Sequence, residues 1–285
     1  MTPTRLGAIA TRMSIVQNRW HGFIAGLVAS GIVLAAAYPC MAADACPPRS
    51  DMHLTFESHF DSLGSSSTND GGWMTTGASG WRTLGDNKEA QYYSDASVGI
   101  NPFSVRDGVL TITASRGKNP EGLPFNSGLL TTYRSFNQLY GYFEMRARLP
   151  AGAGLWPAFW LLPADGSWPP EIDVMEQLGS EPHTIFVGTH SGVGGPNVAT
   201  TTAIHVAETN RAFHVYGLDW QETEITWYFD GESVFKEPTP ADMHTPMYLL
   251  INLAVGGRGS WPGPPPRATV FPARFQVDYL RACSR

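Results

Sequence analysis

The stretch Pro170-Glu171-Ile172-Asp173-Val174-Met175-Glu176-Gln177 places three carboxylates within six residues, among apolar residues that favour strands. A regular strand points alternate side chains to one face, so Glu171 and Asp173 would share a face and Glu176 would point to the other. A β-bulge at Val174-Met175 would insert one residue and return Glu176 to the face of the other two acids. The stretch therefore predicts a bulged strand with three acids along one face of a sheet.

Three neighbouring carboxylates raise one another's pKa and destabilise a strand, so their presence suggests that a reaction uses them. Retaining glycoside hydrolysis needs two carboxyl groups about 5–5.5 Å apart, one as nucleophile and one as acid and base. The alternative is a solvated acidic edge strand. It is disfavoured because Ile172, Val174 and Met175 would bury the opposite face.

Two further runs precede the acids, YGYFEMRAR at 140–148 and GLWPAFWLLP at 154–163. The three runs, in this order, resemble glycoside hydrolase family sixteen, in its branch with a bulged Glu-x-Asp-x-x-Glu pattern. That branch includes laminarinase-like β-1,3-glucanases and bacterial exopolysaccharide endoglycanases. The resemblance covers nearly all of the chain after residue 50, and it implies Glu171 as nucleophile, Glu176 as general acid and base, and Asp173 as the supporting carboxylate.

Contacts with the sugar are predicted for six further residues. Trp156 and Trp160 lie four residues apart and would share a strand face suited to stacking, although core positions are an equal alternative. The resemblance implies polar contacts in the groove for Arg134, Glu89 and Asn252. His190 is a further candidate near the acid and base, but a lone His beside a strand is more often structural.

Asp278 matches a position that in several family members binds a structural calcium together with backbone carbonyls. Carbonyl ligands leave no mark in a sequence, so the resemblance alone carries this prediction of calcium at Asp278. The chain has no Cys and His spacing typical of zinc and no phosphate-binding loop, so we expect catalysis to need no cofactor.

The fold class follows from short apolar runs separated by Gly, Asn, Asp and Pro, with no convincing helical period after residue 50. Asp107-Gly108 and Asp230-Gly231 lie between such runs and predict hairpin turns. We therefore predict an all-β sandwich of two antiparallel sheets. The resemblance sharpens this to a concanavalin-like jelly roll with a substrate groove on its concave sheet.

The composition limits the partners. The 285 residues carry a formal net charge of −6 and include nine Trp, and no basic cluster opposes the acidic balance. Nucleic acid is thus an unsuitable partner, whereas aromatic side chains suit the apolar faces of sugars. We expect a polysaccharide substrate and a monomeric protein.

The N-terminus is typical of an export signal. Arg5, Arg12 and Arg19 precede an apolar run at 23–39 that is shorter than the roughly 20 residues of a membrane-spanning helix, and small residues follow it. We predict a signal peptide at 1–43, a single catalytic domain at 44–285, a secreted or periplasmic location and no membrane association after cleavage. A retained anchor is the alternative, and either Met1 or Met13 could start translation.

Cleavage would leave two cysteines, Cys46 and Cys283, near the two ends of the mature chain. An even pair in an oxidising compartment favours a disulfide, with two free thiols as the alternative.

The leading hypothesis is a secreted retaining endo-glycosidase that hydrolyses β-1,3 or mixed β-1,3/1,4 linkages of glucans. The segment 162–171 is also similar to proteobacterial enzymes that depolymerise succinoglycan-type exopolysaccharide, which makes that polymer the main alternative. A transglycosylase and a non-catalytic lectin on the same fold are the remaining alternatives. The three clustered acids argue against the lectin.

Overall fold

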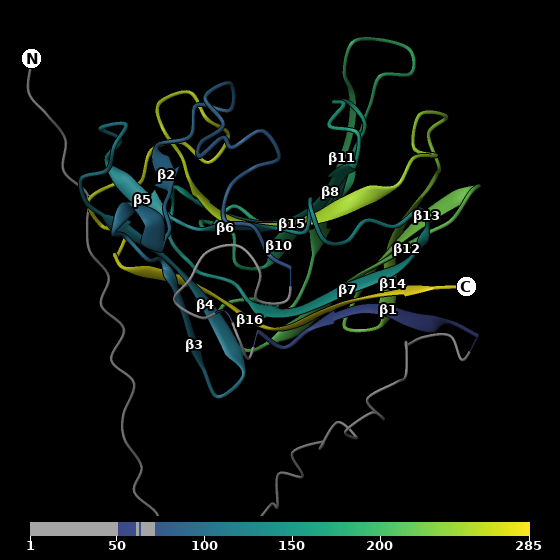
Figure 1. The fold of residues 1–285 in the computed structure, drawn as a ribbon, viewed down its shortest axis with the longest axis horizontal. Helices are drawn as coiled ribbons and strands as arrows, with labels where there is room; N and C mark the ends of the chain where they lie inside the picture. Colours follow the sequence, from purple (N-terminus) through teal and green to yellow (C-terminus); the bar gives the residue numbers. More distant parts are fainter. Residues whose placement is uncertain (1–50, 61–62, 64–71) are drawn as a thin grey trace, which may run out of the picture. The chain divides into compact units, whose positions relative to one another are not determined.

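The computed structural model describes residues 51–60, 63 and 72–285. The chain divides into two units, Met1–Met41 and Ala42–Arg285, and every described residue belongs to the second. That unit consists of sixteen strands and one 3-10 helix, η1 (Ala96–Val98), among its described residues (Figure 1). The all-β prediction is confirmed. The predicted signal peptide at 1–43 lies outside the described residues, and none of the described helices is long and apolar enough to cross a membrane.

The first sheet has ten strands in the order β14-β13-β12-β7-β16-β4-β5-β2, with β1 pairing to β16 and β3 to β4. Their bounds are β1 (His53–Ser58), β2 (Gln91–Tyr93), β3 (Phe103–Arg106), β4 (Val109–Arg116), β5 (Phe125–Ser127), β7 (Gly141–Arg148), β12 (His214–Trp220), β13 (Glu224–Phe229), β14 (Glu232–Pro238) and β16 (Ala273–Ser284).

The second sheet has six strands in the order β11-β10-β9-β8-β15-β6. Its neighbouring strands are all antiparallel. Their bounds are β6 (Leu129–Thr131), β8 (Leu155–Pro163), β9 (Glu171–Glu176), β10 (Thr184–Ser191), β11 (Val198–His205) and β15 (Met247–Val255). The two sheets lie face to face in Figure 1, as predicted for a sandwich. One pairing departs from the prediction, because β2 and β5 run parallel.

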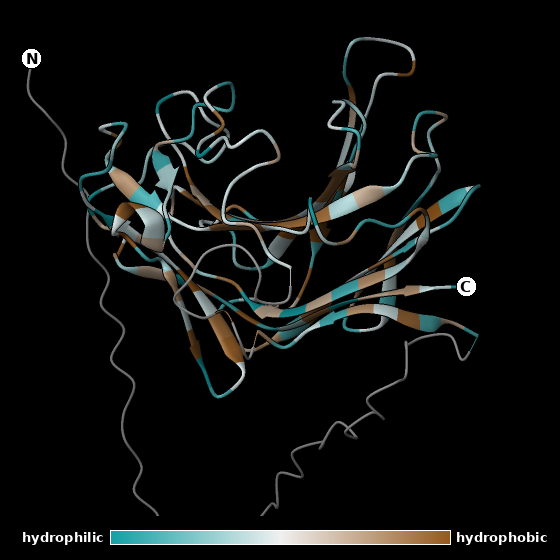
Figure 2. Ribbon diagram, viewed as in Figure 1, coloured by the Kyte–Doolittle hydropathy of each residue, from teal (hydrophilic) through white to brown (hydrophobic). Residues whose placement is uncertain are grey.

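The main core lies between the sheets. It includes Phe143 and Met145 of β7 and Phe159 and Leu161 of β8, which are fully buried. These residues alternate with side chains that point away from the core, as a strand period of two requires. Figure 2 shows hydrophobic residues concentrated in the strands and hydrophilic ones in many of the connections.

A second apolar cluster covers part of the outer face of the second sheet. Strand β15 contributes Tyr248 and Leu250 to it, while Leu249 and Ile251 of the same strand point into the main core. Trp81 and Leu84, from the loop before β2, pack against the second cluster. All nine residues of β15 are consequently buried. The cluster extends onto β8, and none of its described members lies on β9 or β10, whose outer faces remain for a functional site.

The two hairpin turns predicted from Asp-Gly pairs are present. Asp107 and Gly108 have φ angles of 52° and 73°, and Asp230 and Gly231 have φ angles of 50° and 86°. Left-handed φ at both central residues is the requirement of a type I′ turn, whose twist matches that of the flanking strands. These turns join β3 to β4 and β13 to β14.

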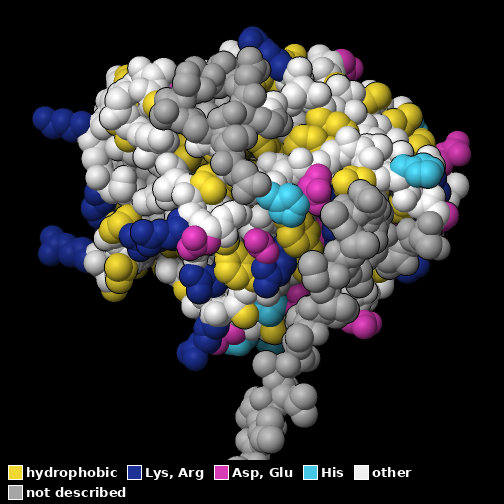
Figure 3. All heavy atoms as spheres, turned by 60° about the horizontal axis from the view of Figure 1, so that its bottom comes forward, with side chains coloured by type: hydrophobic (Ala, Val, Ile, Leu, Met, Phe, Trp, Pro, Cys, Tyr) yellow, Lys and Arg dark blue, Asp and Glu magenta, His cyan; other side chains and the backbone are white. Residues whose placement is uncertain are grey.

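Charged side chains on the outer face of the first sheet form ion pairs with one another. Arg146 forms an ion pair with Asp278, and Arg281 forms one with Glu144. Figure 3 turns the lower part of the Figure 1 view forward, and basic and acidic groups are interspersed on the face that it shows. Cys283, near the end of β16, is buried and disulfide-bonded. Its predicted partner Cys46 lies outside the described residues, so the pairing stays a prediction.

Gly188 of β10 tests the packing beneath the site. A Cβ atom there would lie 1.7 Å from the backbone oxygen of Thr200 on β11. We expect Gly188→Ala to lower the free energy of unfolding by about 1–3 kcal/mol, the usual range for overpacking. At the control position Gly195 the nearest atom is the end of the Val198 side chain at 3.4 Å, so Gly195→Ala should change it little. Chemical denaturation measures both, and equal stabilities would contradict the prediction.

Candidate active site

Strand β9 contains the predicted bulge. On β10, Phe186 pairs with Glu176 and Gly188 pairs with Asp173, so two residues of β9 oppose one residue of β10. The pairing of β9 with β8 shifts register at the same place. The apolar residues of this strand, Ile172, Val174 and Met175, are buried in the main core. The extra residue thereby resets the alternation, as the sequence predicted.

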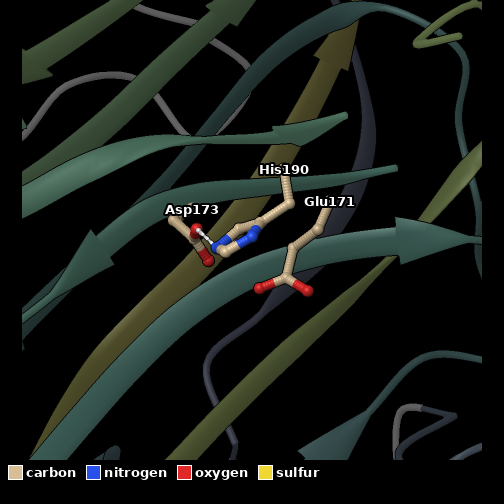
Figure 4. A group of neighbouring side chains, drawn as sticks. All are labelled: Glu171, Asp173 and His190. Atoms are coloured by element: carbon tan, nitrogen blue, oxygen red, sulfur yellow. Dashed lines mark ion pairs between the residues drawn. The ribbon is translucent and has the colours of Figure 1, made fainter. Parts of the chain in front are cut away.

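Glu171, Asp173 and His190 come together on the outer face of the second sheet, and one potential ligand atom from each lies within 4.8 Å of the others. Figure 4 shows the three side chains, with Glu171 and Asp173 from β9 and His190 from the adjacent strand. His190 Nε2 lies 3.6 Å from Asp173 Oδ2, and its Nδ1 lies 3.1 Å from Asn197 Oδ1. Asp173 is 4% exposed, whereas Glu171 and His190 are half-buried.

The two glutamates each accept a hydrogen bond from a different indole. Trp156 Nε1 donates to Glu176 Oε1 at 2.8 Å, and Trp168 Nε1 donates to Glu171 Oε2 at 2.6 Å. The sequence predicted Trp156 as a stacking residue and did not single out Trp168 as a site residue. The one signal for Trp168 was its position three residues before Glu171, which does not specify a contact.

The acids differ in how readily they ionise. Burial, and then the charge of Glu171, raise the pKa of Glu176 from 4.5 to about 8, although the Trp156 hydrogen bond opposes this. Burial also raises the pKa of Asp173, followed by the charges of Glu171 and Glu176 and by a hydrogen bond with Glu171. Protonated Asp173 is the donor in that bond, because a bond that raises the pKa of an acid favours its neutral form. The site thus supplies a proton donor at neutral pH.

Three of the predicted contact residues form one buried hydrogen-bonded chain with Tyr93. Trp160 Nε1 donates to Asn252 Oδ1 at 2.8 Å, and Asn252 Nδ2 donates to the Tyr93 hydroxyl at 2.9 Å. The Tyr93 hydroxyl also hydrogen-bonds Glu89, whose pKa is raised by burial. None of the four residues is more than 9% exposed. These four residues stabilise the sheet surface beside the acids and offer little exposed surface for stacking.

Arg134, which was predicted to contact the sugar, and Trp261, which was not, lie outside this hydrogen-bonded chain. Arg134 is exposed on the turn after β6. It is part of neither the buried hydrogen-bonded chain nor the two indole–glutamate pairs. Trp261, from the loop after β15, is 44% exposed. Its ring makes edge contacts with Trp156 at 5.6 Å and with Phe186 at 4.7 Å between centroids. An exposed aromatic surface therefore lies beside Glu176.

Asp278 lies on the outer face of the first sheet, where its carboxylate pairs with Arg146. A guanidinium on this carboxylate offsets the negative charge that would attract a calcium ion. Among the residues that the structure describes, the one group of three acidic, His or Cys side chains able to hold a metal is Glu171, Asp173 and His190. Calcium at Asp278 stays a prediction.

Comparison with known proteins places the site in a family. The model of Glycosyl hydrolases family 16 matches residues 90–280. Endo-1,3-1,4-beta-glycanase EglC of Rhizobium meliloti is 44% identical over 252 residues, which are 83% of this chain and 52% of that protein. A beta-glucanase of Rhodothermus marinus is 36% identical over 228 residues, covering 72% of this chain and 76% of that protein.

Solved structures agree with this assignment. The laminarinase catalytic domain from Thermotoga maritima superposes with a TM-score of 0.71 at 30% identity, covering 82% of this chain and 99% of that domain. The chain spans about half the length of the Rhizobium meliloti relative. The chain belongs to glycosyl hydrolase family 16, and the predicted family and jelly-roll fold are confirmed.

The raised pKa of Glu176 makes the stability of the folded protein depend on pH. Its pKa is higher in the folded protein than the ordinary value of 4.5, so the folded state binds this proton more tightly and loses stability as the pH rises from about 4.5 to about 8. Neutral Glu176→Gln avoids that loss. We expect its stability advantage over the parent protein to grow across this window and to level off on either side.

Chemical denaturation at a series of pH values measures this difference. The exposed Glu232 on β14 provides the matched control, because Glu232→Gln removes a carboxylate that is not buried. A stability difference for Glu176→Gln that is independent of pH would contradict the assignment of a raised pKa.

Proposed function

We propose that this chain is an endo-acting glycoside hydrolase that cleaves β-1,3 or mixed β-1,3/1,4 linkages of glucans with retention of configuration. The observation that carries the proposal is the bulge in β9, which brings Glu171, Asp173 and Glu176 to one side of one strand. Two carboxyl groups with different protonation are the requirement of this chemistry. The substrates named for the relatives, 1,3-1,4-β-glycan and β-glucan, support the linkage.

In the first step Glu171 attacks the anomeric carbon and forms a glycosyl ester. The bond from that carbon to the leaving oxygen breaks, and Glu176 donates its proton to this oxygen. Asp173, protonated and hydrogen-bonded to Glu171, holds the orientation of the nucleophile. Partial burial and the charge of Glu171 keep Glu176 protonated until the leaving oxygen needs its proton.

In the second step Glu176 removes a proton from the water that attacks the glycosyl ester, and Glu171 is released as a carboxylate. The charge of Glu171 contributes to the raised pKa of Glu176, and esterification removes this charge. The pKa of Glu176 therefore falls when the group must act as a base. One residue can in this way serve as acid and then as base.

Contacts with the polymer are part of the proposal. Trp156 and Trp261 offer aromatic surface beside Glu176, and sugar rings stack on such surfaces. Trp160, Asn252 and Glu89 act by stabilising the sheet surface beside the acids. Arg134 and His190 provide polar groups beside this surface. We further propose that the protein is secreted, on the basis of the N-terminal sequence, and that it acts as a monomer.

A succinoglycan-type bacterial exopolysaccharide is the second candidate substrate. Segment 162–171 favours it, and so does the similarity to two Rhizobium meliloti endo-1,3-1,4-beta-glycanases, of which the second, ExsH, is 43% identical over 251 residues. Both candidates use the same three acids, so the choice concerns the polymer and not the mechanism.

A panel of laminarin, lichenan, curdlan and purified exopolysaccharide tests the function. We expect new reducing ends and a ladder of shorter oligosaccharides from at least one polymer, and none with Glu171→Ala. Mass spectrometry of the products separates the alternatives. Redistributed chain lengths would indicate a transglycosylase, and an unchanged polymer throughout would indicate a lectin and contradict the proposal.

The basic limb of the pH profile tests the role of Glu176. Because this group must be protonated in the free enzyme, kcat/KM should fall above a pH of about 8.

Trp156→Phe keeps an aromatic ring but removes the N–H that stabilises the Glu176 carboxylate. We expect the limb to move upward by about 1 on the pH scale, the worth of a hydrogen bond to a charged group. An unmoved limb would contradict this role of Trp156.

A further inference from the structure

Trp168 is the most exposed tryptophan whose contacts reach the acids. It lies in the connection from β8 to β9 and is 55% exposed. A large aromatic side chain is usually held in place by the residues that bury it, but more than half of Trp168 is exposed. An exposed Trp three residues before the nucleophile therefore needs another explanation for its position and its contact.

The connection fixes Trp168 without burying it. Asp165 Oδ1 accepts hydrogen bonds from the backbone N of Ser167 at 2.9 Å and from its hydroxyl at 2.7 Å. The backbone N of Ala164 donates to Pro246 O at 2.8 Å and ties the connection to the segment before β15. On the other side, residues 169 and 170 are both proline, and a proline ring restricts φ to a narrow range. The chain between Trp168 and Glu171 is accordingly stiff.

The indole of Trp168 meets both a catalytic acid and a neighbouring ring. Its Nε1 donates to Glu171 Oε2 at 2.6 Å, and its ring centroid lies 6.1 Å from that of His190 with an interplanar angle of 39°. An indole N–H is only a donor, so this bond favours the ionised carboxylate. His190 in turn lies 3.6 Å from Asp173, so Trp168 closes a ring of contacts around the nucleophile.

We propose that Trp168 is a positioning residue for the nucleophile. It holds one oxygen of the Glu171 carboxylate in a fixed direction and favours its charged form while the substrate binds. Asp173 holds the same carboxylate from the strand, and Trp168 holds it from the connection. This inference rests on the proposed function, because it assigns Glu171 as the group that attacks the anomeric carbon.

The indole N–H and the indole ring act separately in this proposal. Trp168→Phe removes the N–H and keeps an aromatic ring, whereas Trp168→Ala removes both. We expect Trp168→Phe to lower kcat by about tenfold, because a nucleophile that loses a positioning contact attacks less often in the right geometry. KM should change by less than about threefold.

Trp261→Phe is the matched control. Trp261 is also an exposed tryptophan at this site, but its ring contacts are with Trp156 and Phe186 rather than with Glu171. We expect Trp261→Phe to change KM and not kcat, because its ring offers surface to the polymer and its contacts are not with Glu171. Thermal unfolding of each variant establishes that it is folded, which the exposure of Trp168 and Trp261 leads us to expect.

The division of the effect between kcat and KM decides the outcome. A loss of kcat at little changed KM in Trp168→Phe, but not in Trp261→Phe, supports the proposal, since a merely structural role would change KM and thermal unfolding as well. A kcat in Trp168→Phe close to that of the parent protein overturns it. If the parent protein cleaves no polymer of the panel, the proposed function itself has failed, and this result is distinct from the failure of the positioning role.

Discussion

The single extra residue in β9 is the constraint on which the site depends. Without it, a strand that buries Ile172 and Met175 could not present Glu171, Asp173 and Glu176 on its opposite side. The bulge is held from both sides, because β8 and β10 both shift register beside it. The main core keeps the buried face of β9 in place. The packing of the sandwich therefore fixes the geometry of the acids.

Local surroundings then give three chemically identical groups different tasks. Burial and mutual repulsion favour a proton on Asp173 and on Glu176, and the indole bonds favour charge on the carboxylates that accept them. Two tryptophans, Trp156 of β8 and Trp168 of the connection from β8 to β9, thus complete what β9 alone does not provide. The buried chain from Trp160 through Asn252 and Tyr93 to Glu89 supports the floor below them.

Much of this arrangement could be predicted because it depends on local rules. The bulge follows from the spacing of acids and apolar residues in one strand, and the Asp107-Gly108 turn follows from the φ angles that a type I′ turn requires. The burial of Trp160 could not be settled, because it depends on a loop that packs over β15. The bond from Trp168 to Glu171 depends on the path of a connection that has no periodicity. The parallel pairing of β2 with β5 joins strands of only three residues, too short to show a pattern.

Covalent trapping of the nucleophile tests the central claim most directly. An activated 2-deoxy-2-fluoro β-glucoside oligosaccharide would form a glycosyl ester that is hydrolysed slowly, and mass spectrometry of proteolytic peptides would locate it. The account predicts that the label is attached to Glu171 and that it is absent from Glu171→Ala. A label on Glu176 or on Asp173 would contradict the assignment of nucleophile and acid on the two ends of the bulged strand.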